Sequence, residues 1–293
     1  MTDVFIDSKP GPEPSPTLGA YPLGASTAET DRLGRQAAEL RPQASDLLDR
    51  CQLSPGARAL DLGCGPLGIL DLLSERVGPG GQVTGLDADP RHVALARELV
   101  RERGLTNVHI IEGDARTTGL PSSSFDLVHA RTLLVNVLDP PAVVAEMIRL
   151  VKPGGYVAVH EPDVAASVCY PPLPAWDQLR GVFLTAFQQD GADLFIGRRL
   201  PTLLREAGLE DVGVEARADV YPLGHTRRTI VPDLVRALRP RIVSRLLSEQ
   251  ALDELDRAVR DHLEDPHTLV VPHLYFLAWG RQPLIVPGPS RPG

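Results

Sequence analysis

One stretch, from Ala59 to Gly68, constrains this chain more than any other. It reads Ala-Leu-Asp-Leu-Gly-Cys-Gly-Pro-Leu-Gly, so a short apolar run is followed by three glycines. The run indicates a buried strand, and the glycines indicate a tight turn that lets the backbone approach a ligand. Pro66 suits the first position of a helix, which the following leucine spacing supports. The stretch predicts a ligand site at the carboxyl end of a strand.

A glycine turn by itself is also compatible with a plain connection between a strand and a helix. Two further strand patterns favour the ligand site. Residues 82–87 end at Asp87, at the spacing where a βαβ unit places a carboxylate on a ribose, and residues 108–112 are followed by Asp114. A ligand that contains adenosine and lies across these strand ends would contact Asp61, Asp87 and Asp114.

These segments resemble those of the class I S-adenosylmethionine-dependent methyltransferases. The matching segments are Asp61–Gly65, Asp87, Gly113–Ala115, Phe125–Val128 and Leu150–Gly155. One departure is visible, because the family often has a glycine at the place of Leu67, whereas here the glycine is Gly68. The resemblance implies an α/β fold: a Rossmann-like, doubly wound, mostly parallel seven-stranded sheet. Alternating strand and helix patterns are typical of the same fold.

The resemblance also implies how S-adenosylmethionine is held. The backbone of the glycine turn suits the methionyl carboxylate, and Asp61 suits the ammonium. Asp87 would accept hydrogen bonds from the ribose and Asp114 from the adenine amino group. The predicted cofactor-binding residues are Tyr21, Arg32, Gln36, Asp61, Gly63, Cys64, Gly65, Asp87, Ala88, Gly113, Asp114, Ala115 and Arg131. The alternative for each acid is a helix cap or a loop carboxylate, and Asp89 fits that alternative best.

The segment before the core has two interpretations. Residues 1–20 are rich in proline and predict a disordered arm, and residues 21–55 predict two helices, with Ser26 as the first N-cap. Similar bacterial methyltransferases carry the pattern that includes Tyr21, Arg32 and Gln36. The helices are therefore either a lid that closes over the cofactor or a collar that packs on the sheet.

The rest of the chain predicts a core with insertions. Trp176, Phe183, Phe187 and Phe195 concentrate aromatics in the first insertion. We expect the insertions to form a helical cap over a small apolar acceptor, although at least half of these aromatics would only pack the cap. The predicted divisions are a cofactor-binding core (56–161), a cap insertion (162–197), a core helix and strand (198–220), a cap insertion (221–270), the last core strand (271–282) and a loose tail (283–293).

Methyl transfer from a sulfonium is an in-line displacement, which positioning and exclusion of water can accelerate without an acid–base pair. A base matters only for a weakly acidic acceptor. His160 and Glu161, at the end of the fifth strand pattern, are the catalytic candidates, and strand alternation lets only one of them face the pocket. For His160 a satisfied buried histidine is an equal alternative.

Charge and cysteine content limit the kinds of partner and compartment that suit this chain. The net charge of −8 argues against a broad basic surface for nucleic acid, and the pairs Arg198-Arg199 and Arg227-Arg228 suit solvated helix ends. Three scattered cysteines fit a reducing compartment, and no cluster has metal-ligand spacing. Without a signal peptide or a membrane-length apolar run, the expectation is a cytoplasmic monomer or homodimer.

The sequence therefore predicts a methyltransferase that moves a methyl group from S-adenosylmethionine to an O, N or C atom of a small, apolar metabolite. Two alternatives stay open. A nicotinamide-dependent oxidoreductase also needs glycines and an acid after the second strand. A core that binds the cofactor without methyl transfer, as a regulatory module or a cyclase, is compatible because methyl transfer needs no dedicated catalytic residue.

Overall fold

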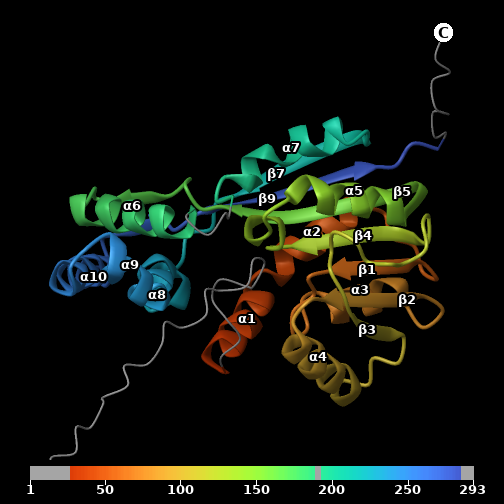
Figure 1. Cartoon of the computed structure of the whole chain (residues 1–293), viewed down its shortest axis with the longest axis horizontal. Helices are drawn as coiled ribbons and strands as arrows, with labels where there is room; N and C mark the ends of the chain where they lie inside the picture. The colour runs from red at the N-terminus through yellow and green to blue at the C-terminus, as the bar shows by residue number, and fades with distance from the viewer. Residues whose placement is uncertain (1–26, 189–192, 285–293) are drawn as a thin grey trace, which may run out of the picture.

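The structure is a computed structural model, and it describes residues 27–188 and 193–284 (Figure 1). The predictions for the arm, for Tyr21 and for the Ser26 cap lie outside these residues, as does the predicted tail beyond Leu284.

Seven strands form one sheet in the order β3-β2-β1-β4-β5-β9-β7. Neighbours from β3 to β5 pair in parallel, whereas β9 is antiparallel to both β5 and β7. This order confirms the predicted doubly wound sheet, with its last strand reversed. The strands are β1 (Arg58–Leu62), β2 (Gln82–Asp87), β3 (Val108–Glu112), β4 (Phe125–Arg131), β5 (Val151–Asp163), β7 (Glu210–Arg217) and β9 (Leu274–Arg281).

Helices cover both faces of this sheet. The helices on one face are α2 (Arg41–Arg50), α3 (Leu70–Val77) and α4 (Pro90–Glu102), and those on the other are α5 (Pro140–Leu150) and α7 (Ile196–Glu206). Successive side chains of β1 point to opposite faces of the sheet, so Ala59 packs in one apolar cluster and Leu60 in the other. Burial on both faces explains why this strand reads as a continuous apolar run.

A helical lobe extends beyond the carboxyl end of β5 (Figure 1). Its helices contact one another, and the aromatic side chains of Trp176, Phe183 and Phe187 are buried in its interior. At least half of the aromatics therefore pack the lobe, as expected. The lobe consists of β6 (Val168–Tyr170), α6 (Pro174–Gln188), α8 (Ile230–Ala237), α9 (Arg239–Arg245), α10 (Glu249–Leu263) and β8 (Leu269–Val271).

Two helix predictions are wrong. The helix after the glycine turn begins at Leu70 and not at Pro66, because Gly68 has a φ of +53° and interrupts helical geometry. In the second insertion, Leu234, Leu238, Ile242 and Leu246 recur at helical spacing and predict one helix, whereas the structure has two, α8 and α9, which meet at Leu238. Pro240 lies in the first turn of α9, where its missing N–H costs no hydrogen bond.

The prediction of a solvated Arg227-Arg228 pair is also wrong. Both side chains are buried, on the short 3-10 helix η2 (Thr226–Thr229) that leads into α8. Arg228 donates to the carbonyls of Leu263 and Thr268, and Arg227 forms an ion pair with Glu39 at the end of α1 (Thr27–Glu39). Sequence reasoning could not see these partners, because they are far away along the chain.

Candidate active site

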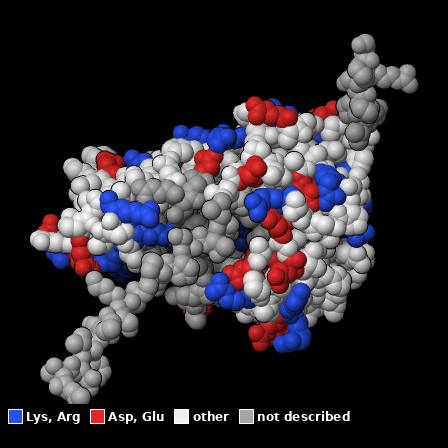
Figure 2. Space-filling model, in the orientation of Figure 1, with Lys and Arg blue, Asp and Glu red and all other residues white. Residues whose placement is uncertain are grey.

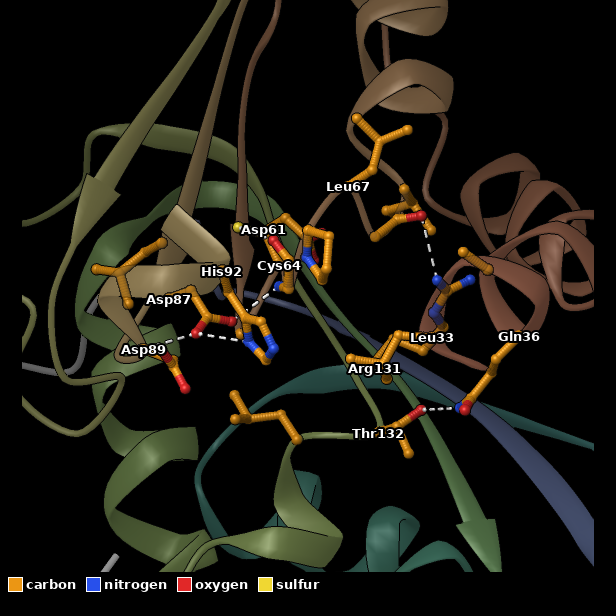
Figure 3. Close-up of a pocket in the computed structure, with 18 of the residues that line it drawn as sticks. Leu33, Gln36, Asp61, Cys64, Leu67, Asp87, Asp89, His92, Arg131 and Thr132 are labelled. Atoms are coloured by element: carbon orange, nitrogen blue, oxygen red, sulfur yellow. Dashed lines mark hydrogen bonds and ion pairs between the residues drawn. The ribbon is translucent and has the colours of Figure 1, made fainter. Parts of the chain in front are cut away.

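A cavity of about 1130 Å³ opens at the carboxyl ends of β1, β2, β3 and β4. Helix α1 forms one wall, and the glycine turn, the start of α4 and the loops after β3 and β4 form the others. Figure 3 shows Asp87, Asp89 and His92 on one side and Arg131, Thr132 and Gln36 on the other. Twelve of the predicted cofactor residues line it: Arg32, Gln36, Asp61, Gly63, Cys64, Gly65, Asp87, Ala88, Gly113, Asp114, Ala115 and Arg131.

The glycine turn is shaped by left-handed backbone. Gly63, Gly65 and Gly68 have φ values of +66°, +57° and +53°. A side chain at Gly68 would place its Cβ 2.5 Å from the Cys64 carbonyl oxygen and 2.8 Å from Asp61 Oδ2. Glycine is therefore required at Gly68 both for its backbone angle and for the close approach of Asp61. The buried Cys64 thiol has its pKa raised well above the usual value by burial, so it stays protonated.

Asp61 is held by a buried histidine. Its Oδ1 lies 2.7 Å from Nδ1 of His129 on the neighbouring strand β4, and both side chains are almost completely buried. The residues face each other because Asp61 and His129 are in register across the β1–β4 pair. This contact fixes the carboxylate at the cavity wall, where it can attract an ammonium group.

Asp87 is tied to the turn that it faces. Its Oδ2 accepts from the Gly65 N–H at 2.8 Å and its Oδ1 from the Asp89 N–H at 2.9 Å. His92 Nδ1 lies 3.5 Å from Oδ1, and the hydrogen bond to Asp87 raises the pKa of His92. Asp89 caps α4 by accepting from the Arg91 N–H, which confirms its role as a helix cap.

Asp114 is the most exposed of the three strand-end acids. Its carboxylate pairs with Arg116, and this hydrogen bond lowers the pKa of Asp114. Because the side chains of Asp114 and Arg116 are each nearly half exposed, water screens the ion pair and leaves it weak. A ligand amino group can therefore compete for Asp114 at little cost.

Arg131 supplies a cationic group to the cavity. Its Nη2 donates to the Gly68 carbonyl at 3.1 Å, and its buried Nη1 has no hydrogen-bond partner within the described residues. A buried N–H without an acceptor costs about 1–3 kcal/mol. Arg131 and Asp61 together fit the carboxylate and the ammonium of a methionyl group, so the residues present suit S-adenosylmethionine.

Helix α1 contacts the core through Gln36. The Gln36 amide lies 3.4 Å from the Thr132 hydroxyl, just after β4, and Arg32 Nη1 donates to the Gln36 oxygen at 2.7 Å. Residues 31–38 of this helix line the cavity. The position of α1 along the cavity is that of a wall, which favours the lid interpretation over the collar.

Neither catalytic candidate lies among the described residues that line the cavity, and both are fully buried. Glu161 accepts from the N–H groups of Leu133, Leu134 and Val135 and so fixes the loop after β4, which carries the 3-10 helix η1 (Leu134–Asn136). His160 points to the opposite face, where its Nε2 lies 3.0 Å from Gln43 Oε1 on α2.

Several cavity residues escaped sequence reasoning. His92, Leu67, Thr132, Leu133 and Asn136 all line the cavity. His92 had a usable signal, since an N-cap at Asp89 places it in the first turn of α4, beside the end of β2. Thr132 had a weaker signal, as the residue that directly follows β4.

A family model described as a methyltransferase domain matches residues 53–190. The chain is 32% identical over 197 residues to a demethylmenaquinone methyltransferase of Geobacillus sp. (strain WCH70), covering 62% of this chain and 84% of that protein. It is 42% identical over 123 residues to nocamycin O-methyltransferase of Saccharothrix syringae, covering 42% and 44%. The [4+2]-cyclase SpnF has the same fold, with a TM-score of 0.54 and 24% identity over 83% of this chain and 81% of that chain.

The sheet order and the strand-end cavity define a Rossmann-like cofactor-binding protein. Together with these relatives they make the assignment specific: the chain belongs to the S-adenosylmethionine-dependent methyltransferases, and S-adenosylmethionine is its cofactor.

Proposed function

We propose that this enzyme methylates a small, largely apolar molecule. The observation that carries the proposal is the concave cavity, which lies at the strand ends behind α1 and not on an open charged face. On the face in Figure 2, basic and acidic side chains are interspersed in small groups. Such a surface suits a small acceptor better than a nucleic acid, which needs a continuous basic area.

The names of the relatives support the same class of acceptor. One is a demethylmenaquinone methyltransferase, and another is an O-methyltransferase named for nocamycin. The likeness to a cyclase concerns the fold alone. No helix among the described residues is both long and apolar enough to cross a membrane.

In this proposal, different residues of the cavity bind different parts of the cofactor. Asp61 and Arg131 hold the methionyl ammonium and carboxylate, Asp87 the ribose, and Asp114 with the Ala115 N–H the adenine. When bound, the cofactor supplies an electrophilic methyl group. Gln36 and the rest of α1 exclude water from that part of the cavity.

The prediction that both insertions form a cap over the acceptor has to be changed. No residue of 162–197 or 221–270 is among the described residues that line the cavity. The helical lobe instead borders the sheet beside β5 and β9. We therefore place the acceptor between the cavity and this lobe and not beneath a roof over the cofactor.

Incubation with methyl-labelled S-adenosylmethionine and a panel of small metabolites tests the proposal. We expect label in a small product, with one S-adenosylhomocysteine released for each methyl group transferred. Cofactor binding without transfer to any member of the panel would favour the non-transferring module, and label in protein or nucleic acid would contradict a small acceptor.

A further inference from the structure

A second group of buried polar side chains lies where the helical lobe meets the sheet. It consists of His160 on β5, Tyr275 on β9, Arg227 on η2 and His273 between β8 and β9; we call it the seam. The Tyr275 ring centroid lies 5.1 Å from that of His160 and 4.9 Å from that of His273. Arg227 Nη1 lies 3.4 Å from the Tyr275 hydroxyl.

Three buried atoms of the seam have no hydrogen-bond partner in the part of the chain that the structure describes. They are His160 Nδ1, His273 Nδ1 and Arg227 Nη2. The neighbouring Arg228 is a useful contrast, because its buried guanidinium donates to four carbonyls, those of Tyr221, Leu263, Asp265 and Thr268. Unpaired buried polar groups are rare, so three on side chains that surround Tyr275 indicate a ligand that supplies partners.

The orientation of His160 is set by two residues outside the seam. Gln43 donates through its amide nitrogen to Asp219, which turns its oxygen toward His160 Nε2. An amide oxygen only accepts, so Nε2 carries the hydrogen and Nδ1 presents a lone pair. Burial, and then the charge of Arg131, lower the pKa of His160 well below its usual value, so the ring is neutral.

We propose that the seam binds a hydroxyl group of the methyl acceptor and that Gln43 and Asp219 are positioning residues for this contact. The hydroxyl donates to His160 Nδ1 and accepts from Arg227 Nη2. An alcohol, a phenol or an enol satisfies both groups, whereas a protonated amine has no lone pair for the guanidinium. The inference rests on the proposed function and narrows its acceptor to a hydroxyl compound.

The seam is one strand away from the cavity. His160 is in register with Arg131 on β4, whose side chain lines the cavity, and adjacent strands lie about 4.8 Å apart. In the transfer step the hydroxyl proton passes to His160 Nδ1 while the oxygen bonds to the methyl carbon. The electron pair of the broken carbon–sulfur bond stays on sulfur, so the products are a methyl ether and S-adenosylhomocysteine. The imidazolium releases its proton to water when the seam opens and the product leaves.

The unpaired atoms are closed off from solvent, so the acceptor enters by parting the seam. The ion pair between Arg227 and Glu39 joins η2 to the end of α1 at this place. Opening the seam therefore exchanges a polar contact between the lobe and the wall of the cavity for contacts with the acceptor hydroxyl.

Nitrogen-15 NMR of the histidine side chains tests the positioning role without turnover. In the complex with S-adenosylhomocysteine we expect His160 as the Nε2–H tautomer, and in Gln43→Met as a mixture of tautomers. His129, which is held by Asp61, serves as the internal control and keeps its signal in both proteins. An Nδ1–H tautomer of His160 in the unmodified protein would overturn the inference.

A pair of matched probes tests the hydroxyl site. With S-adenosylhomocysteine present, 4-nitrophenol should bind at least about tenfold more tightly than 4-nitroanisole, which lacks the hydroxyl hydrogen. Arg227→Lys keeps the charge but loses the second branch of the guanidinium, so it should weaken the binding of both probes, because each keeps the oxygen that accepts from Nη2. Gln43→Met should reduce the preference for the nitrophenol, and the exposed control Arg199→Gln should leave both affinities unchanged.

Calorimetry with S-adenosylhomocysteine alone distinguishes failure of the proposed function from failure of the hydroxyl site. If the unmodified protein does not bind it, the proposed function fails. If it binds and the protein shows no preference for the nitrophenol, or if Arg227→Lys retains full affinity for both probes, the seam inference fails while the proposed function stands. Thermal unfolding of each variant verifies that the fold is intact.

Discussion

The acids of the cavity and the buried side chains of the seam differ in how far their hydrogen bonding is complete. In the cavity, Asp61 contacts His129, Asp87 accepts from the Gly65 N–H, and Asp114 pairs with Arg116. In the seam, His160 and Arg227 each keep a polar atom without a partner among the described residues. The three acids therefore have hydrogen-bond partners before the cofactor binds, whereas the buried groups of the seam gain theirs only when a ligand binds.

This difference suits the two molecules that the enzyme must bind. The cofactor has fixed charges, so rigid partners cost little entropy when it binds. The acceptor must enter and leave at every turnover, and a region with incomplete hydrogen bonding opens more easily than a fully paired one. The following predictions concern the cavity and the segments that hold it in place.

The largest effect should come from Gly68→Ala, which would break the organisation of the cavity. The left-handed backbone costs a non-glycine residue about 1–2 kcal/mol, and the contacts with Cys64 and Asp61 add about 1–3 kcal/mol. Denaturant unfolding should show a loss of about 2–5 kcal/mol together with weakened S-adenosylhomocysteine binding. The matched control is Gly104→Ala, with a φ of +64° and nothing within 4 Å of a Cβ, which should show the backbone cost alone. Equal losses in the two variants would contradict the close approach.

Asp87→Ala should weaken S-adenosylhomocysteine binding by about 1.5–3 kcal/mol, or roughly ten- to a hundredfold, through loss of charge-assisted hydrogen bonds. Asp126→Ala is the control, since Asp126 also accepts from a backbone N–H but lies outside the cavity lining. Unchanged affinity in the Asp87 variant, measured by calorimetry, would remove the role that we assign to this carboxylate.

Glu161 gives a prediction on pH. Burial raises its pKa to about 8, against three N–H groups that lower it, so the folded protein binds a proton that the unfolded chain has released. The contribution of Glu161 to stability is therefore present below the unfolded pKa and is lost as the pH rises toward 8, with a slope of up to about 1.4 kcal/mol per pH unit. The difference in unfolding free energy between the unmodified protein and Glu161→Gln isolates this slope. A flat difference from pH 5 to 8 would show that Glu161 is ionised throughout.

Gln36→Ala should produce the smallest effect. It removes the contact between α1 and Thr132 and one hydrogen-bond acceptor of Arg32, which should lower affinity for S-adenosylhomocysteine about three- to fivefold, or up to about 1 kcal/mol. If α1 is only a collar, calorimetry will show the same affinity as in the unmodified protein. Thermal unfolding of the variant verifies that its fold is intact.

Much of the cofactor half could be predicted from the sequence. A strand that ends at Asp61, a glycine turn, and later strands that end near Asp87 and Asp114 are local patterns, and parallel pairing brings such strand ends to one edge. Ten of the predicted residues line one cavity for that reason, and Arg32 and Gln36 join them from α1. The start of α3 could not be placed correctly, because Gly68 acts through a contact with Asp61 that the local pattern does not contain.

The alternation of strands and helices and the cofactor edge could be read from the sequence, since both follow from periodicity and from residues adjacent in the chain. The reversal of the last strand and the partners of the buried charges emerged from the folded chain alone. Arg227 meets Glu39 from a position 188 residues away, and Gln43 joins Asp219 to His160 across three separate segments. Such contacts depend on how the lobe and α1 are folded back onto the sheet, and burial then makes each hydrogen bond strong enough to fix a tautomer or an ion pair.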